Sequence, residues 1–135
     1  MSLFNVFAIS GSAVSAQSKR LNVVASNLAN ADAVAGPDGQ AYKARQIQFE
    51  TQPVDGSEVA GVRVSGVLET TAPVRRVLEP GNQLADSDGY VTHSNVNVVD
   101  EMVNMISASR SYQNNIEVMN TAKTLLMKTL QMGQG

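Results

Sequence analysis

The spacing of apolar residues changes twice along this chain, from a helical period to an alternating one and back. At both ends, apolar side chains recur at alternating steps of three and four residues, which is typical of the narrow seam between paired helices. The predicted N-terminal seam contains Leu3, Phe7, Val14, Leu21, Val24, Leu28 and Ala31. The predicted C-terminal seam contains Val98, Met102, Met105, Tyr112, Ile116, Met119, Leu126 and Leu130. Long helices are therefore expected over residues 3–31 and 96–132.

The ends of the second helix are predicted from its flanking residues. Ser94 or Asn95 is placed to cap its first turn, because hydroxyl and amide side chains accept the free N–H groups there. Gly133 is placed to end it, because glycine is the preferred residue just past a helix.

The middle of the chain contains nearly all of the turn-forming residues, such as Gly36-Pro37-Asp38-Gly39 and Pro80-Gly81. That density of turns leaves no room for a helix. Short alternating stretches between the turns predict strands near residues 47–49, 62–68, 74–78 and 90–92. The predicted fold class is therefore α+β, with a coiled-coil-like pair of long terminal helices and a small irregular β domain of about three to five strands. The corresponding segments are residues 1–31, 32–95 and 96–135.

Composition excludes several classes of protein. The 135 residues carry a net charge of −2 without a basic stripe, so nucleic-acid binding has no support. Cysteine is absent, which excludes disulfides and thiolate metal sites. The sequence has no run of about 18 apolar residues, so no transmembrane helix is predicted. A cleaved signal peptide is not expected either, because no Lys or Arg precedes the first apolar stretch, which Asn5, Ser10 and Gly11 interrupt.

The faces opposite the two seams carry small neutral polar side chains where a solvated helix normally carries Glu, Lys and Arg. They include Ser12, Ser15, Asn22 and Ser26 at one end and Asn104, Ser107, Asn114 and Asn120 at the other. Such side chains can be buried at little cost, whereas charges rarely can. We interpret each helix as contacted on several sides inside a larger assembly, and we expect it to order fully only there. The alternative is a soluble helical hairpin that acts as an adaptor for a partner helix.

Candidate chemical sites fail on their spacing. Asp86, Asp88 and Gly89 match part of a calcium loop, but Leu84 and Asn95 then fall where the loop needs carboxylates. A tight turn explains these residues better. His93 is the only histidine, so it has no second histidine with which to bind a metal. The sequence predicts no catalytic, cofactor or metal site and no small-molecule substrate, and a hydrolase or calcium-binding module is the least favoured alternative.

Several motifs resemble those of the flagellar rod and hook axial proteins. The resemblance rests on residues 21–32, which read LNVVASNLANAD, on Tyr42-Lys43-Ala44-Arg45, and on residues 95–106 and 110–115. The opening residues 1–7 and the stretch 36–42 resemble the proximal-rod members in particular. The wider family has Thr-x-Gly-Tyr shortly after the Ala-Asn pair, and a longer Gly/Pro-rich insert before Tyr42 departs from it here. That departure also favours the proximal-rod members.

This resemblance implies a structural subunit of the bacterial flagellum basal body, exported by the flagellar type III apparatus without a cleaved signal. It would assemble with other rod proteins and with copies of itself into the drive shaft in the periplasm that transmits torque. The terminal helices would form the inner tube, and the middle would face outward. Asn27, Asn30 and Asn115 are candidates for amide bonds that fix register, although they also suit ordinary helix-end or surface positions. Tyr42 belongs to the shared motif, and Tyr112 is expected to fill the seam.

Overall fold

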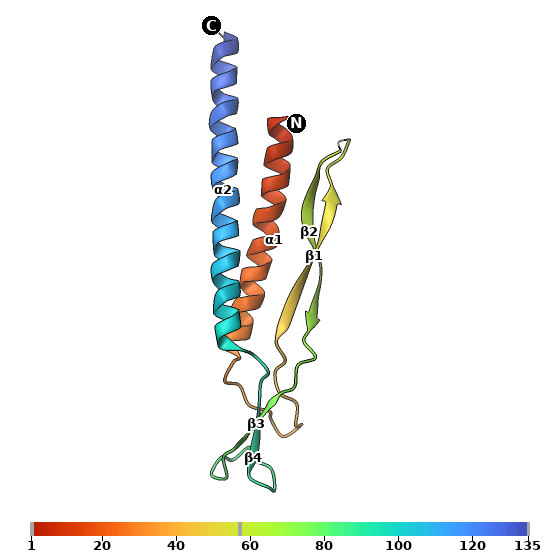
Figure 1. Ribbon diagram of the computed structural model, residues 1–135, viewed down its shortest axis with the longest axis vertical. Helices are drawn as coiled ribbons and strands as arrows, with labels where there is room; N and C mark the ends of the chain where they lie inside the picture. Colours follow the sequence, from red (N-terminus) through yellow and green to blue (C-terminus); the bar gives the residue numbers. More distant parts are fainter. Residues whose placement is uncertain (1, 57, 135) are drawn as a thin grey trace.

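The computed structural model describes residues 2–56 and 58–134, which form an elongated α+β molecule (Figure 1). The helices α1 (Leu3–Ala29) and α2 (Val98–Gln134) lie side by side, and α2 projects beyond the N-terminal end of α1. Both helices begin and end within about two residues of the predicted bounds, the usual uncertainty at helix ends. The α+β class is confirmed. Neither helix is long and apolar enough to cross a membrane.

The residues predicted to cap and to end α2 are wrong. Asn97 is the residue whose Oδ1 accepts a backbone N–H of the first turn, at 3.2 Å. Ser94 and Asn95 do not cap the helix, because their side chains bond to backbone groups of the segment that follows α1. The helix also continues through Gly133. A glycine inside a helix costs only about 1 kcal/mol relative to alanine, so it does not by itself end one.

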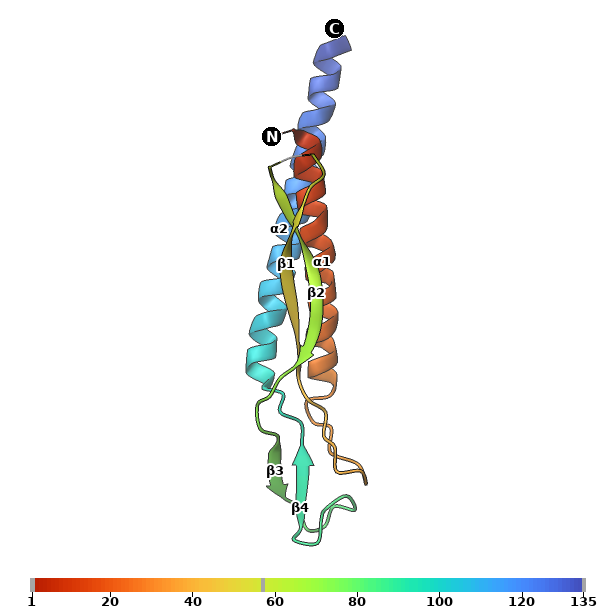
Figure 2. The same cartoon turned by 90° about the vertical axis from the view of Figure 1, so that its right-hand side faces the viewer.

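Strands appear at all four predicted places. The strands β1 (Arg45–Pro53) and β2 (Ala60–Glu69) form an antiparallel hairpin that lies along α1, with a register shift between Gln48 and Phe49. The strands β3 (Arg75–Leu78) and β4 (Tyr90–His93) form a second antiparallel pair beyond the ends of the helices (Figure 2). The described strands therefore make two separate two-stranded sheets, because the first hairpin packs on a helix and not on the second pair.

The buried core is small and lies where the helices meet the loops. Its centre is a cluster of Ala31, Ala44 and Val96, with Tyr42 packed against it. Val91 of β4, five residues before Val96, is fully buried. Most large apolar side chains of α2 lie outside this cluster. This cluster therefore fixes the base of the helix pair, and beyond it α2 is buried along one side only, at residues such as Ala108 and Ala122.

A close contact between β2 and α1 fixes the position of the hairpin. The Ser12 hydroxyl donates to the Ile9 carbonyl at 2.6 Å and accepts the Val62 N–H at 3.0 Å. Beside it, a Cβ atom on Gly61 would lie 2.5 Å from Ser12 Oγ and 3.2 Å from Ser12 Cβ. The strand can approach the helix this closely because residue 61 has no side chain.

Replacing Gly61 by alanine should lower the free energy of unfolding by about 1–3 kcal/mol, because the new methyl group pushes β2 away from α1. Urea unfolding of the purified chain measures the change. The matched control is Gly66→Ala in the same strand, where an added Cβ would meet no described heavy atom within 4 Å. Equal losses from the two substitutions would show that β2 does not pack on α1 as described.

Candidate subunit interface

One strip of α2 faces α1. Its most buried members are Glu101, Ala108 and Ala122, and Asn115 is half-buried between the two alanines. These four residues recur at steps of seven, the spacing of one side of a paired-helix seam. Ala108 is 0% exposed. Small side chains in this row allow the two helices to approach closely.

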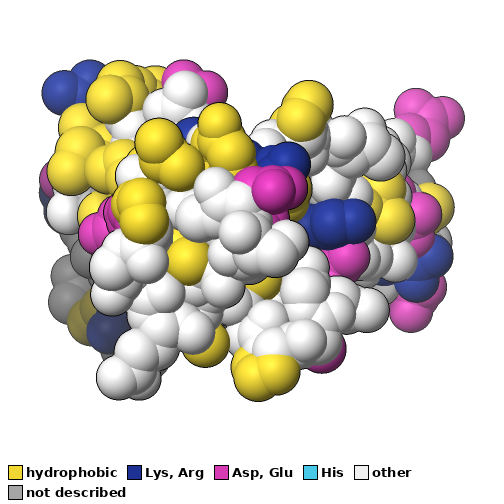
Figure 3. Space-filling model, turned by 90° about the horizontal axis from the view of Figure 1, so that it is seen from below, with side chains coloured by type: hydrophobic (Ala, Val, Ile, Leu, Met, Phe, Trp, Pro, Cys, Tyr) yellow, Lys and Arg dark blue, Asp and Glu magenta, His cyan; other side chains and the backbone are white. Residues whose placement is uncertain are grey.

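The remaining surface of α2 is rich in exposed apolar side chains. Near its start these are Val98, Val99, Met102, Val103, Met105 and Ile106, and toward its end they are Val118, Leu125, Met127, Leu130 and Met132. Viewed from the β3–β4 end, the molecule shows further hydrophobic side chains at its surface (Figure 3). Exposed apolar residues of β3, β4 and their connection include Val77, Leu78, Leu84 and Tyr90. Exposed apolar patches of this kind mark surfaces that bind other proteins.

An apolar groove lies between the N-terminal end of α1 and the second half of α2. Its walls include Leu3 and Val6 from α1 and Val118 and Leu125 from α2, and its volume is ≈ 490 Å³. The groove continues the exposed apolar surface of α2 onto α1. The helix pair therefore offers a surface to which both helices contribute.

The predicted seam residues fall into two groups in the single chain. Val24 is buried, and the following are half-buried: Phe7, Val14, Leu21, Leu28, Tyr112, Ile116, Met119 and Leu126. Val98, Met102, Met105 and Leu130 are exposed. These four do not hold α2 against α1, and their packing between subunits stays a prediction. Sequence reasoning missed the row that begins at Glu101, because two of its members are polar and the other two are alanines without a large apolar side chain, although their spacing of seven was visible.

Asn27 is the centre of a buried hydrogen-bond network at the end of α1. Its side chain is 0% exposed, and its Nδ2 donates to the Arg45 carbonyl at 2.8 Å. Its Oδ1 accepts the Arg45 N–H and the Tyr42 hydroxyl, both at 2.9 Å. The Tyr42 hydroxyl also lies 3.3 Å from the Ser26 hydroxyl. This network joins α1 to the start of β1, so Asn27 and Tyr42 of the shared motif act together within one subunit.

A second polar network joins the segment before α2 to the middle of the chain. Asn95 Oδ1 accepts the Ala44 N–H at 2.6 Å, and its Nδ2 donates to Thr70 Oγ1 at 2.8 Å. The fully buried Ser94 donates its hydroxyl to the Ala31 carbonyl at 2.7 Å. These bonds hold the first turn of α2 beside the last turn of α1. The base of the helix pair is thereby fixed by side chains that sequence reasoning assigned to helix capping.

The other two register candidates bond within their own helices. Asn30 Nδ2 donates to the Ser26 carbonyl, and Asn115 Nδ2 donates to the Ser111 carbonyl, each at 2.8 Å. Asn30 is also the C-cap residue of α1. A role for either residue in register between subunits stays a prediction.

The residues that match part of a calcium loop form a tight turn. Asp86 Oδ1 accepts the N–H groups of Asp88 and Tyr90 at 3.0 and 2.9 Å, and Gly89 has a φ of 86°. The Tyr90 N–H, assisted by the Arg76 guanidinium, holds the pKa of the Asp86 carboxyl below its usual value. The prediction of a tight turn is confirmed. Across residues 2–56 and 58–134, no three His, Cys, Asp or Glu side chains come together where a metal ion could bind.

The paired helices, the apolar surface of α2 and the extended β middle are the features of an elongated structural subunit that packs against other chains. Two family profiles match its ends, namely "Flagella basal body rod protein" over residues 7–37 and "Flagellar basal body rod FlgEFG protein C-terminal" over residues 87–132. The chain belongs to the family of flagellar basal-body rod proteins.

Similar proteins cover the chain almost end to end. The chain is 60% identical to the "Flagellar basal-body rod protein FlgC" of Salmonella typhimurium (strain LT2), over 99% of this chain and 100% of that protein. The proteins of the same name from Yersinia enterocolitica and Escherichia coli O157:H7 are 60% and 58% identical, with the same coverage. The predicted resemblance is confirmed, and the chain is a structural rod subunit of the flagellar basal body. Family membership favours this role over the adaptor and the hydrolase or calcium-binding alternatives.

Proposed function

We propose that this chain polymerises through its two terminal helices into the proximal rod, the drive shaft that transmits torque across the periplasm. In this arrangement α1 and α2, with the residues next to them in segments 1–31 and 96–135, form the inner tube. Segment 32–95, which contains both β hairpins, faces outward. The observation that carries the proposal is the exposed apolar surface along α2 in a chain of the rod family. The projecting end of α2 becomes covered only when a neighbouring subunit packs on it.

The partners in this proposal are copies of this chain, other rod proteins and the flagellar type III export apparatus. A surface on one subunit that fits a different surface on the next generates a helical assembly, as the rod requires. Export without a cleaved signal is supported by the packing of α1. Cleavage after Ala16 would remove Ser12, whose hydroxyl bonds the Val62 N–H of β2. The N-terminal segment is therefore part of the folded subunit.

Replacing Ile106 by aspartate tests the proposal. Ile106 is 56% exposed, so the substitution should change the free energy of unfolding of the isolated chain by no more than about 0.5 kcal/mol. In the assembled rod the substitution would place an unpaired carboxylate in an apolar contact between subunits. The free-energy cost there is several-fold larger. The variant should be stable and exported but absent from purified basal bodies, and the cells should not swim.

The matched control is Ile106→Leu, which keeps an apolar side chain of the same size and should be incorporated normally. Immunoblots of basal bodies, of the secreted fraction and of whole cells separate assembly from export and from expression. Normal swimming by the Ile106→Asp strain would contradict a role for this face of α2 in the rod.

A further inference from the structure

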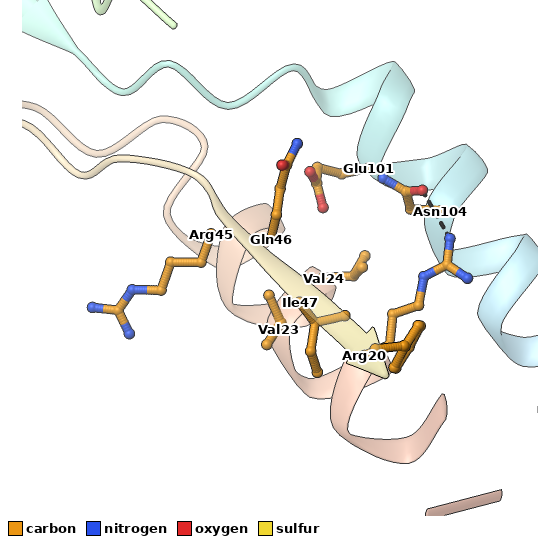
Figure 4. A pocket seen from close by; sticks show the side chains of 9 residues that line it. Arg20, Val23, Val24, Arg45, Gln46, Ile47, Glu101 and Asn104 are labelled. Atoms are coloured by element: carbon orange, nitrogen blue, oxygen red, sulfur yellow. Dashed lines mark hydrogen bonds between the residues drawn. The ribbon is translucent and has the colours of Figure 1, made fainter. Parts of the chain in front are cut away.

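A pocket of ≈ 400 Å³ lies between α1, α2 and β1 near the start of α2. Val23, Ile47 and Phe49 contribute apolar walls, and Arg20, Glu101 and Asn104 contribute polar groups. Figure 4 shows the Glu101 carboxylate pointing from α2 into this space, while the Arg45 guanidinium points away from it. The pocket is far larger than the share of about 30 Å³ that one water molecule takes up in the liquid.

Glu101 is the unusual member of this pocket. The residue is 8% exposed, and its Oε2 is buried without a hydrogen-bond partner among the described residues. The ion pairs of the described chain involve other acidic residues. A buried carboxylate without a donor is costly, so such a group in a native structure calls for a partner.

The nearby cationic residue of this pocket, Arg20, bonds to side chains other than Glu101. Arg20 Nη2 donates to Asn104 Oδ1 at 3.0 Å, and its Nη1 lies 3.5 Å from Gln17 Oε1. The dashed line in Figure 4 marks the bond to Asn104, and Arg20 forms no ion pair with Glu101. Among the residues that the structure describes, the Glu101 carboxylate is therefore unpaired, while the Arg20 guanidinium ties α1 to α2.

We propose that this pocket receives a lysine or arginine side chain from a neighbouring rod subunit, and that its cationic group binds the Glu101 carboxylate. The inference rests on the proposed function, because it requires rod subunits to pack on the helix pair. The apolar walls suit the methylene stem of such a side chain, which is buried along apolar surface while its charged end finds a partner. A charged donor also gives the strongest bond that a carboxylate can accept.

The chain itself shows that rod subunits present such side chains on apolar helices. Lys123 and Lys128 lie on the second half of α2 among exposed apolar residues, and both are exposed. No acidic residue follows Glu117 in the sequence, and neither lysine has an ion pair among the described residues. A cation carried on an apolar helix surface is therefore available for a contact between subunits.

The test compares Glu101→Gln with Asp100→Asn. Asp100 is the exposed acidic neighbour in the same first turn of α2, so it controls for the loss of a carboxylate near a helix N-terminus. In the isolated chain, Glu101→Gln should melt no lower than Asp100→Asn, because the lost charge had no partner. In basal bodies, Glu101→Gln should be incorporated about tenfold less or worse, as expected when one member of a buried charge pair is removed. Asp100→Asn should be incorporated as the unmodified chain is.

Second-site revertants identify the partner. Motile revertants of a Glu101→Lys strain should carry an acidic substitution at a lysine or arginine of a rod subunit. Revertants confined to Arg20, or a Glu101→Gln chain that melts clearly below Asp100→Asn, would show an intrachain partner and overturn the proposal. Normal incorporation of Glu101→Gln would overturn it as well. Absence of the unmodified chain and of Asp100→Asn from basal bodies would instead contradict the proposed rod function.

Discussion

Replacing Asn27 by alanine should lower the free energy of unfolding of this subunit by about 3 kcal/mol, since each buried polar group left unpaired costs about 1–3 kcal/mol. The substitution removes three hydrogen bonds at once, two to the backbone of Arg45 and one to the Tyr42 hydroxyl. Those bonds hold the last turn of α1 to the start of β1. We therefore also expect the variant to be missing from the rod, because the β1–β2 hairpin loses its anchor.

Urea unfolding followed by circular dichroism measures this effect, and two variants calibrate it. Asn22→Ala lies on the same helix at an exposed position and should change the free energy of unfolding by no more than about 0.5 kcal/mol. Tyr42→Phe removes only the hydroxyl of the network and should cost about 1 kcal/mol. If Asn27→Ala costs no more than Asn22→Ala, then the network does not contribute to the stability of the chain.

The elements of this fold could be predicted because the period of the apolar residues differs between helix and strand. The alternating stretch at residues 62–68 lies within β2, and the stretch at residues 74–78 includes all of β3. In α2, Tyr112, Met119 and Leu126 repeat at steps of seven and are half-buried. Large apolar residues at regular steps therefore identified one side of the helix contact.

The other side of that contact could not be found from hydrophobicity. The row that begins at Glu101 and continues through Ala108 is buried because the helices lie close together, and its residues are small or polar. The apolar pattern selected Met102 instead, one position further along, and that side chain is exposed in the single chain. Neighbouring residues on a helix point about 100° apart. A seam assigned one residue too far along therefore lies on the surface open to other subunits and not on the contact with α1.

The residues of the polar networks could be predicted from the sequence, but their hydrogen-bond partners could not. Asn27 and Tyr42 stood out through the shared motif, but their bond to each other depends on how the chain turns back after α1. The same holds for Ser94 and Asn95, whose sequence position suggested helix caps. Hydrogen bonds between segments far apart in the sequence leave no local pattern, so only the folded chain shows them.

Ala108→Asp should produce the largest loss of stability in the helix pair. Ala108 is fully buried between α1 and α2, so a carboxylate there would be desolvated without a partner. A buried charge without a partner typically costs about 3–5 kcal/mol. We therefore expect Ala108→Asp to lower the free energy of unfolding by at least that much. The isolated chain should therefore lose the packing of α2 on α1, unlike Ile106→Asp, which should fail only at assembly.

The matched control is Ser107→Asp, one residue earlier on the exposed face of the same helix, which should change the free energy of unfolding by no more than about 0.5 kcal/mol. Ala108→Ser adds a small side chain whose hydroxyl can bond the carbonyl four residues earlier, and it should fall between the two. Urea unfolding of the three purified variants measures the order. Residues 107 and 108 are adjacent, so their side chains point to different sides of α2. Equal losses of unfolding free energy from the two aspartates would therefore mean that α2 does not present Ala108 to α1. The assignment of the outer face of α2 to neighbouring subunits would then fail as well.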